Sequence, residues 1–137
     1  MTPEILARIT AARAARDLSD LARQAVGTTA APMSPAERIQ AARYIRQMAN
    51  ELVNYVVLAE VLAGAEWADI TQALNRRDPR TVEGEYADAV AAWRALQEEE
   101  MTVVAEGTQD LDDWYARHRE DHDPAVENPV SDLRNRH

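Results

Sequence analysis

The sequence contains no cysteine, no phenylalanine and no lysine, and it has only four glycines among 137 residues. Without cysteine, the chain forms no disulfide, carries no thiol nucleophile and offers no thiolate ligand to zinc. Alanine and arginine are frequent, which favours helices, and the residues that usually build strands are scarce. These features predict an all-α protein.

Long apolar runs are also missing. The apolar stretch from Leu52 to Leu62 is shorter than the roughly 20 residues that span a bilayer, and it is interrupted by Asn54 and Glu60. The first residues, Met-Thr-Pro-Glu, lack the charged and then apolar layout of a signal peptide. We therefore expect a cytoplasmic protein that makes no membrane contact.

Acidic residues outnumber basic ones, and the charges are unevenly distributed along the chain. The formal net charge is −9. Residues 1–50 hold seven arginines against four acids, residues 51–100 hold four against eleven, and residues 101–137 hold four against nine. This asymmetry predicts a bipolar surface, on which any contact with nucleic acid is confined to a local patch.

Helix caps mark two long helices in the first half of the chain. Thr2 is a suitable cap for a surface helix that runs to about Ala25 and buries one apolar stripe. Residues 34–37, Ser-Pro-Ala-Glu, are typical of a capping box and predict a long helix from there to about Ala63, with Gly64 as its stop. The C-terminal half of this second helix is apolar nearly all round, so we expect it to form the centre of the core.

Shorter helices are expected in the second half. The pattern predicts a helix from Glu66 to Leu74, a polar turn over residues 75–78, a helix over residues 79–97, and a last short helix capped by Asp110. From Asp121 onward, two prolines and few apolar residues predict a disordered acidic tail. The expected architecture is one helical domain over residues 1–120, a small bundle of about five helices, followed by a tail over residues 121–137.

Residues 66–92 have the spacing of a helix-turn-helix. Trp67, Ile70 and Leu74 fall on one face of the first short helix, and Val82 and Tyr86 fall on one face of the next. These five apolar residues can close a corner between two helices joined by about four residues. In this layout the second helix presents its early residues to the major groove of DNA.

Residues 64–86 resemble the small helix-turn-helix modules of actinobacterial proteins that are related in shape to region 4 of sigma factors. The residues that carry the resemblance are Trp67, Ala68, Ile70, Ala73 and Leu74 in the first helix, and Arg80, Thr81, Val82 and Tyr86 in the second. The resemblance covers about a fifth of the chain and implies DNA binding. The chain departs from the family at Gly84 and Glu85, where such modules usually place arginine before the aromatic anchor.

The candidate DNA-binding residues are Arg76, Arg77, Arg80, Thr81 and Glu83. The arginines suit phosphates or guanine edges, Thr81 suits a base or a phosphate, and Glu83 can accept a hydrogen bond from a cytosine amino group. We therefore predict a small DNA-binding regulatory or accessory protein that acts on transcription and whose partner is double-stranded DNA. The basic first helix would add phosphate contacts, and a homodimer through the long helix or the last helix would double them.

The acidic residues of the second helix support a different prediction. Glu83, Glu85 and Asp88 weaken an interaction with phosphates and suit a basic surface on a protein. The chain would then be a protein–protein interaction module on a helix-turn-helix scaffold that docks through the acidic face of helix 79–97. A structural assembly protein is a third alternative, because helix-turn-helix geometry occurs in many proteins that touch no DNA.

Motifs for catalysis, cofactors or metals are not found. The sequence has no glycine-rich phosphate loop and no inward-facing Glu-x-x-His pair. His118 and His122 are four residues apart, but they lie at the edge of the predicted tail, and the consecutive acids Glu98 to Glu100 face different directions on a helix. We expect a protein that is not an enzyme and that holds no cofactor and no metal.

Overall fold

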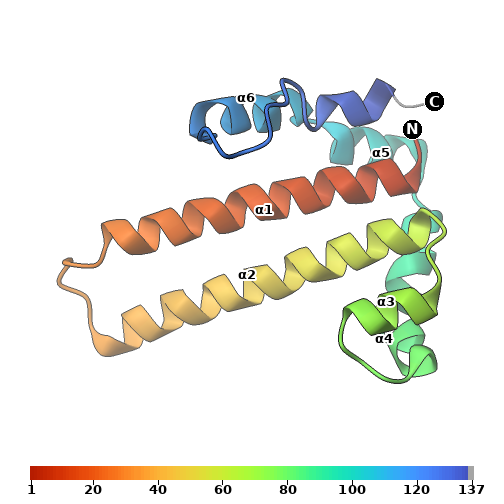
Figure 1. Ribbon diagram of the computed structural model, residues 1–137, viewed down its shortest axis with the longest axis horizontal. Helices are drawn as coiled ribbons and strands as arrows, with labels where there is room; N and C mark the ends of the chain where they lie inside the picture. The colour runs from red at the N-terminus through yellow and green to blue at the C-terminus, as the bar shows by residue number, and fades with distance from the viewer. Residues whose placement is uncertain (136–137) are drawn as a thin grey trace.

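The computed structural model describes residues 1–135, and this part of the chain is helical, with no strand. The helices are α1 (Pro3–Gly27), α2 (Pro35–Leu62), α3 (Trp67–Ala73), α4 (Pro79–Arg94), α5 (Glu98–Ala105), α6 (Thr108–His118) and the 3-10 helix η1 (Ser131–Asn135). In Figure 1, α1 and α2 form a long antiparallel hairpin. Helices α3 and α4 lie against one end of α2, and the C-terminal helices lie against α1. The predicted all-α bundle is confirmed.

The two long helices begin and end where their caps predict. The Thr2 hydroxyl accepts a hydrogen bond from the first turn of α1, and Ser34 and Glu37 form a reciprocal capping box at the start of α2. Helix α2 ends at Leu62, and Gly64 follows with a φ of 99°. Glycine adopts this left-handed conformation without a steric penalty, so it stops the helix and lets the chain turn toward α3.

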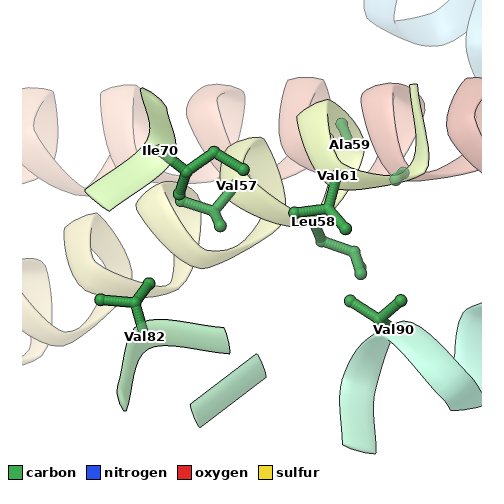
Figure 2. Packing of buried hydrophobic residues seen from close by; sticks show 8 residues of the cluster. Val57, Leu58, Ala59, Val61, Ile70, Val82 and Val90 are labelled. Atoms are coloured by element: carbon green, nitrogen blue, oxygen red, sulfur yellow. The ribbon is translucent and has the colours of Figure 1, made fainter. Parts of the chain in front are cut away.

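The main core lies between the C-terminal half of α2 and the α3–α4 pair. Its buried residues are Ala7, Val57, Leu58, Ala59, Val61, Ile70, Val82 and Val90. Figure 2 shows Val57 beside Ile70 of α3, and Leu58 and Val61 directed toward Val90 of α4. The prediction that this half of α2 forms the centre of the core is confirmed.

Helix α1 differs from the predicted surface helix with one buried stripe. Its N-terminal half is covered on two sides, because Ala7 belongs to the main core while Ile9 packs with Leu111 of α6 and Val130 in a second cluster. The predicted stripe left out Leu6, Ala7 and Ala11, all of which are buried. Small alanine side chains let α2 approach α1 closely, so α1 buries two faces in its N-terminal half.

The other half of the hairpin projects beyond the rest of the molecule, as Figure 1 shows. No residue from 22 to 50 is buried, and Val26 and Ile39 are 75% and 61% exposed. We call residues 22–50 the projecting half. No helix among residues 1–135 combines the length and the apolar character that crossing a membrane requires.

Two boundaries differ from the prediction in the last third of the chain. The predicted helix 79–97 stops at Arg94, and α5 begins separately because Gln97 and Glu100 form a capping box of their own. Helix α6 is preceded by Gly107, whose φ is 82°, and it begins at Thr108, so the expected cap Asp110 lies inside its first turn. In both places a local turn starts a new helix within a stretch of polar residues.

Part of the tail predicted over residues 121–137 is held against the helices. The carboxylate of Asp112, a residue only 2% exposed, accepts hydrogen bonds from the backbone N–H groups of Val130, at 2.8 Å, and Ser131. Val130 is itself buried against α1 and α6, and Leu133 packs beside it. One carboxylate and two apolar residues thus hold residues 130–133, and the Tyr115 hydroxyl donates a hydrogen bond of 2.6 Å to the Pro124 carbonyl oxygen. These contacts are too few to appear as a pattern in the composition of the segment. Residues 136–137 of the predicted tail lie outside the described residues.

Candidate nucleic-acid interface

Helices α3 and α4 are joined by residues 74–78 and form the helix-turn-helix arrangement predicted for residues 66–92. Ile70 and Val82 are buried in the corner. The rings of Trp67 and Tyr86 stack with their centroids 6.2 Å apart, and the Tyr86 hydroxyl donates a hydrogen bond of 2.8 Å to Asn54 of α2. The contacts hold α2, α3 and α4 together as a three-helix unit with a fixed corner.

The turn between the two helices is shaped by Asn75 and Asp78. Asn75 has a φ of 57°, in the left-handed region that asparagine adopts more readily than most residues. The Asp78 carboxylate accepts hydrogen bonds from the Thr81 hydroxyl, at 2.8 Å, and from the Arg80 backbone N–H, at 3.1 Å. These two bonds favour the charged form and lower the pKa of Asp78. The hydroxyl of Thr81, a candidate for DNA contact, therefore takes part in the helix cap.

Arg76 is also engaged within the chain. Its guanidinium forms a bidentate ion pair with the Glu85 carboxylate of α4, with N–O distances of 3.0 and 3.1 Å. The hydrogen bond raises the pKa of Arg76 and lowers that of Glu85. The pair neutralises one acid on α4 and directs the Arg76 side chain from the turn toward α4.

Arg77, Arg80 and Glu83 complete the set of five candidate residues, and all three are exposed. Within residues 1–135 the side chains of these three residues make no hydrogen bond and no ion pair. The turn and the first helical turns of α4 therefore present two free guanidiniums and one free carboxylate to solvent.

The arginines of α1 behave differently from those of the turn. Each has a partner within the chain: Arg8 with Glu4 and Glu60, Arg13 with the backbone carbonyls of Val104 and Glu106, Arg16 with Asp17, and Arg23 with Asp20. The hydrogen bond from Arg8 to Glu60 is the main reason that the pKa of Arg8 is raised. In the basic first helix, expected to add phosphate contacts, Arg8 and Arg13 thus tie α1 to other elements, while Arg16 and Arg23 are paired within α1 itself.

The outward face of α4 changes character after its first turns. Arg80, Gly84 and Asp88 follow one another at intervals of four residues and are exposed, while Val82 and Val90 are buried. A Cβ atom added at Gly84 would meet no atom within 4 Å. This face is therefore basic at its start, flat in the middle and acidic further along.

His118 and His122 do not form a metal site with their described neighbours. The His118 ring stacks on Trp114 at 4.8 Å, and its Nδ1 lies 2.8 Å from the Trp114 carbonyl oxygen. His122 lies 3.9 Å from a Glu120 carboxylate oxygen and 3.7 Å from one of Asp123, at an exposed position. No group of three or more possible metal ligands is found in the part of the chain that the structure describes.

Comparison of the chain with models of protein families, with curated proteins and with solved structures gives no match. The function is therefore inferred from the arrangement of the side chains. Free guanidiniums at the start of an outward-facing helix can bind phosphate oxygens or guanine edges.

Proposed function

We propose that the protein is a DNA-binding regulatory or accessory protein, without enzymatic activity, that approaches double-stranded DNA with residues 74–78 and the first turns of α4. The observation that carries this proposal is the pair of exposed guanidiniums of Arg77 and Arg80, which have no partner within residues 1–135. They lie at the start of a helix whose opposite face is buried in the core. A rigidly held helix with free arginines at its start suits the major groove.

The other candidate residues have supporting parts in this proposal. The bond from Thr81 to Asp78 fixes the start of α4, and so it sets the direction in which Arg80 points. The Arg76–Glu85 pair keeps Glu85 from repelling phosphates. Glu83 is free to accept a hydrogen bond from a cytosine amino group, which would contribute to sequence preference more than to affinity.

The test is a fluorescence-anisotropy titration of mixed-sequence duplex DNA at several salt concentrations. We expect the wild-type chain to bind, and a Arg77→Ala/Arg80→Ala variant to lose about tenfold or more in affinity at low salt. Each lost phosphate contact should also reduce the slope of log K against log salt by about 0.9.

A matched control removes two exposed arginines elsewhere. Arg117 of α6 and Arg134 of η1 are exposed, and their side chains make no hydrogen bond or ion pair within the described range. The variant Arg117→Ala/Arg134→Ala has the same net charge as the test variant, so it should bind DNA like the wild type. Equal losses in both variants, or no binding by the wild type at low salt, would contradict the proposal.

A second candidate function is supported by the acids of α4. Glu83 and Asp88 are exposed and form no ion pair within residues 1–135. Such a face suits a basic protein partner. The two candidates predict opposite effects of a Glu83→Ala/Asp88→Ala variant: DNA binding should tighten, whereas binding of an arginine-rich peptide to a protein-interaction module should weaken. A wild type that binds the peptide and not DNA would favour the second candidate.

A further inference from the structure

Two arginines of α2 lie on the same side of that helix as α3 and α4. Arg43, Arg46, Asn50 and Val57 are spaced by three, four and seven residues, which places them on one face of the helix. Val57 packs beside Ile70 of α3, as Figure 2 shows. The face that holds the helix-turn-helix at one end of α2 therefore continues into the projecting half, where it presents Arg43 and Arg46.

The end of α3 that leads into the turn with Arg77 is the end nearer to these two arginines. The C-terminal end of α3, with Ala73 and Leu74, lines a shallow groove with Leu52 and Val53 in the middle of α2. Trp67, at the start of α3, lies by Val61 near the end of α2. Helix α3 thus runs back along α2, in agreement with Figure 1, and its C-terminal end lies beside Leu52 and Val53, from where the turn leads to α4.

The spacing along α2 fits the dimensions of DNA. At the α-helical rise of about 1.5 Å per residue, Arg46 lies about 10 Å and Arg43 about 15 Å along the axis from Val53. The major groove is about 12 Å wide, and successive base pairs are about 3.4 Å apart. Phosphates about three to four base pairs apart along a duplex span these same axial distances, so one duplex placed along this face can reach both the end of α3 and the two arginines.

The surroundings of the two arginines suit a polyanion. No acidic residue occurs from Arg38 to Asn50, and neither Arg43 nor Arg46 makes an ion pair or side-chain hydrogen bond in the region that the structure covers. Both line an open polar surface with Gln40, Gln47 and Asn50, whose amides can also donate to phosphate oxygens. By contrast, three of the four α1 arginines are paired with carboxylates.

We propose that Arg43 and Arg46 form a second contact with the DNA backbone, separate from the one made by the turn and α4. The proposal rests on the proposed function, since it takes double-stranded DNA as the ligand. The α2 contact reads no sequence. It adds phosphate neutralisation and fixes the orientation of the duplex along the projecting half.

The experiment compares three double variants on the same mixed-sequence duplex of about 30 base pairs. They are Arg43→Ala/Arg46→Ala, Arg77→Ala/Arg80→Ala, and the control Arg117→Ala/Arg134→Ala. We expect the α2 variant to lose roughly fivefold to tenfold in affinity, with a salt slope reduced by up to about 2, and the control to match the wild type. A Arg43→Lys/Arg46→Lys variant should recover most of the loss, because phosphate attraction needs the charge. All substitutions are at exposed positions, and circular dichroism checks that the variants are folded.

The outcomes separate this inference from the proposed function. If the wild type binds DNA and only the Arg77/Arg80 variant is weakened, the α2 contact is overturned while the proposed function stands. If only the α2 variant is weakened, the α2 contact is supported and the role of the turn is overturned. If the wild type binds no DNA, both are overturned, and binding of a polyglutamate peptide through Arg43 and Arg46 would assign this face to an acidic protein instead.

Discussion

The two sides of the α1–α2 hairpin are held together by different kinds of interaction. On the α1 side, polar contacts dominate: Asp112 binds the backbone at Val130, Trp114 donates to Asp20 at 3.1 Å, and Arg13 donates to backbone carbonyls between α5 and α6. On the α2 side, apolar side chains between α2, α3 and α4 supply most of the packing. The arginines of α1 therefore have partners within the chain, while most of the charged residues on the α2 side stay at the surface.

This difference explains why only part of the basic N-terminal third of the sequence is available as a basic surface. Four of the seven arginines in residues 1–50 are in α1 and are paired there. An exposed ion pair is weak, so this pairing lowers the availability of the α1 arginines for phosphate without abolishing it. Arg43 and Arg46 of α2 have no such partner within residues 1–135.

The largest expected effect on stability is at a polar contact on the α1 side of the hairpin. Replacing Asp112 with alanine leaves the backbone N–H groups of Val130 and Ser131 without their buried acceptor. We expect a loss of about 3 kcal/mol in the free energy of unfolding, measured by urea denaturation. Asp110→Ala, at an exposed position in the same helix, should change it by less than about 0.5 kcal/mol. A loss below about 1 kcal/mol for Asp112→Ala would show that the C-terminal segment contributes little.

The next effect tests the apolar side. Val82 is completely buried between α2 and α4, so Val82→Ala removes two methyl groups and leaves a small cavity. We expect a loss of about 2 kcal/mol in the free energy of unfolding. Val103→Ala, at a residue that is 65% exposed, is the matched control and should be nearly neutral. Equal effects of the two substitutions would contradict the assigned core.

A smaller effect is expected at the contact between α6 and α1. Burial raises the pKa of Asp20, but hydrogen bonds from Trp114 and Arg23 outweigh it, and the pKa is lowered overall. A lowered pKa means that this stabilisation is complete above the ordinary aspartate pKa of about 3.9 and is lost as the pH falls through the folded-state value. Trp114→Phe keeps an aromatic ring and removes the indole N–H, so it should cost up to about 1 kcal/mol at pH 7.

The pH dependence of that variant gives the sharper measurement. Thermal or urea unfolding of the wild type and Trp114→Phe should differ at pH 7 and converge as the pH falls below about 4, because protonated Asp20 no longer benefits from the donor. A stability difference that stays constant from pH 7 to pH 3 would show that the loss comes from packing of the Trp114 ring and not from its hydrogen bond to Asp20.

The smallest effect on stability concerns Arg76 and Glu85. Their ion pair is exposed, with 43% and 48% of the side chains accessible, so Glu85→Gln should leave the urea midpoint unchanged within error. The same substitution releases Arg76 and removes one negative charge from α4. We expect DNA affinity at low salt to rise about threefold in the anisotropy titration. A fall in affinity would show that Glu85 supports the interface by orienting Arg76.

Several elements were predictable because their causes are local. The capping box at Ser34 and Glu37, the cap at Asp78 and the stop at Gly64 each depend on a few neighbouring residues, and each is present as expected. The helix-turn-helix corner was also predictable, since Trp67, Ile70, Val82 and Tyr86 are close in sequence as well as in space.

Other features depend on residues that are far apart in the chain. Arg8 meets Glu60 across 52 residues, and Arg13 meets the backbone carbonyls near α6 across more than 90. Asp112 reaches across to Val130 and orders a segment whose composition resembles a disordered one. Arg43 and Arg46 were not singled out from the sequence, although their spacing from Val57 and the absence of nearby acids would have indicated them.

The sequence alone determined the helical class, the positions of most helix ends and the corner at residues 66–92, because caps, alanine content and apolar spacing act within a few turns of the chain. Only the tertiary structure decided which charges are free. Ion pairing and burial depend on which helices are neighbours, and the sequence does not show whether a given arginine meets a carboxylate or water. In this protein the packing gives each arginine of α1 a partner within the chain and leaves Arg43, Arg46, Arg77 and Arg80 exposed and unpaired within residues 1–135.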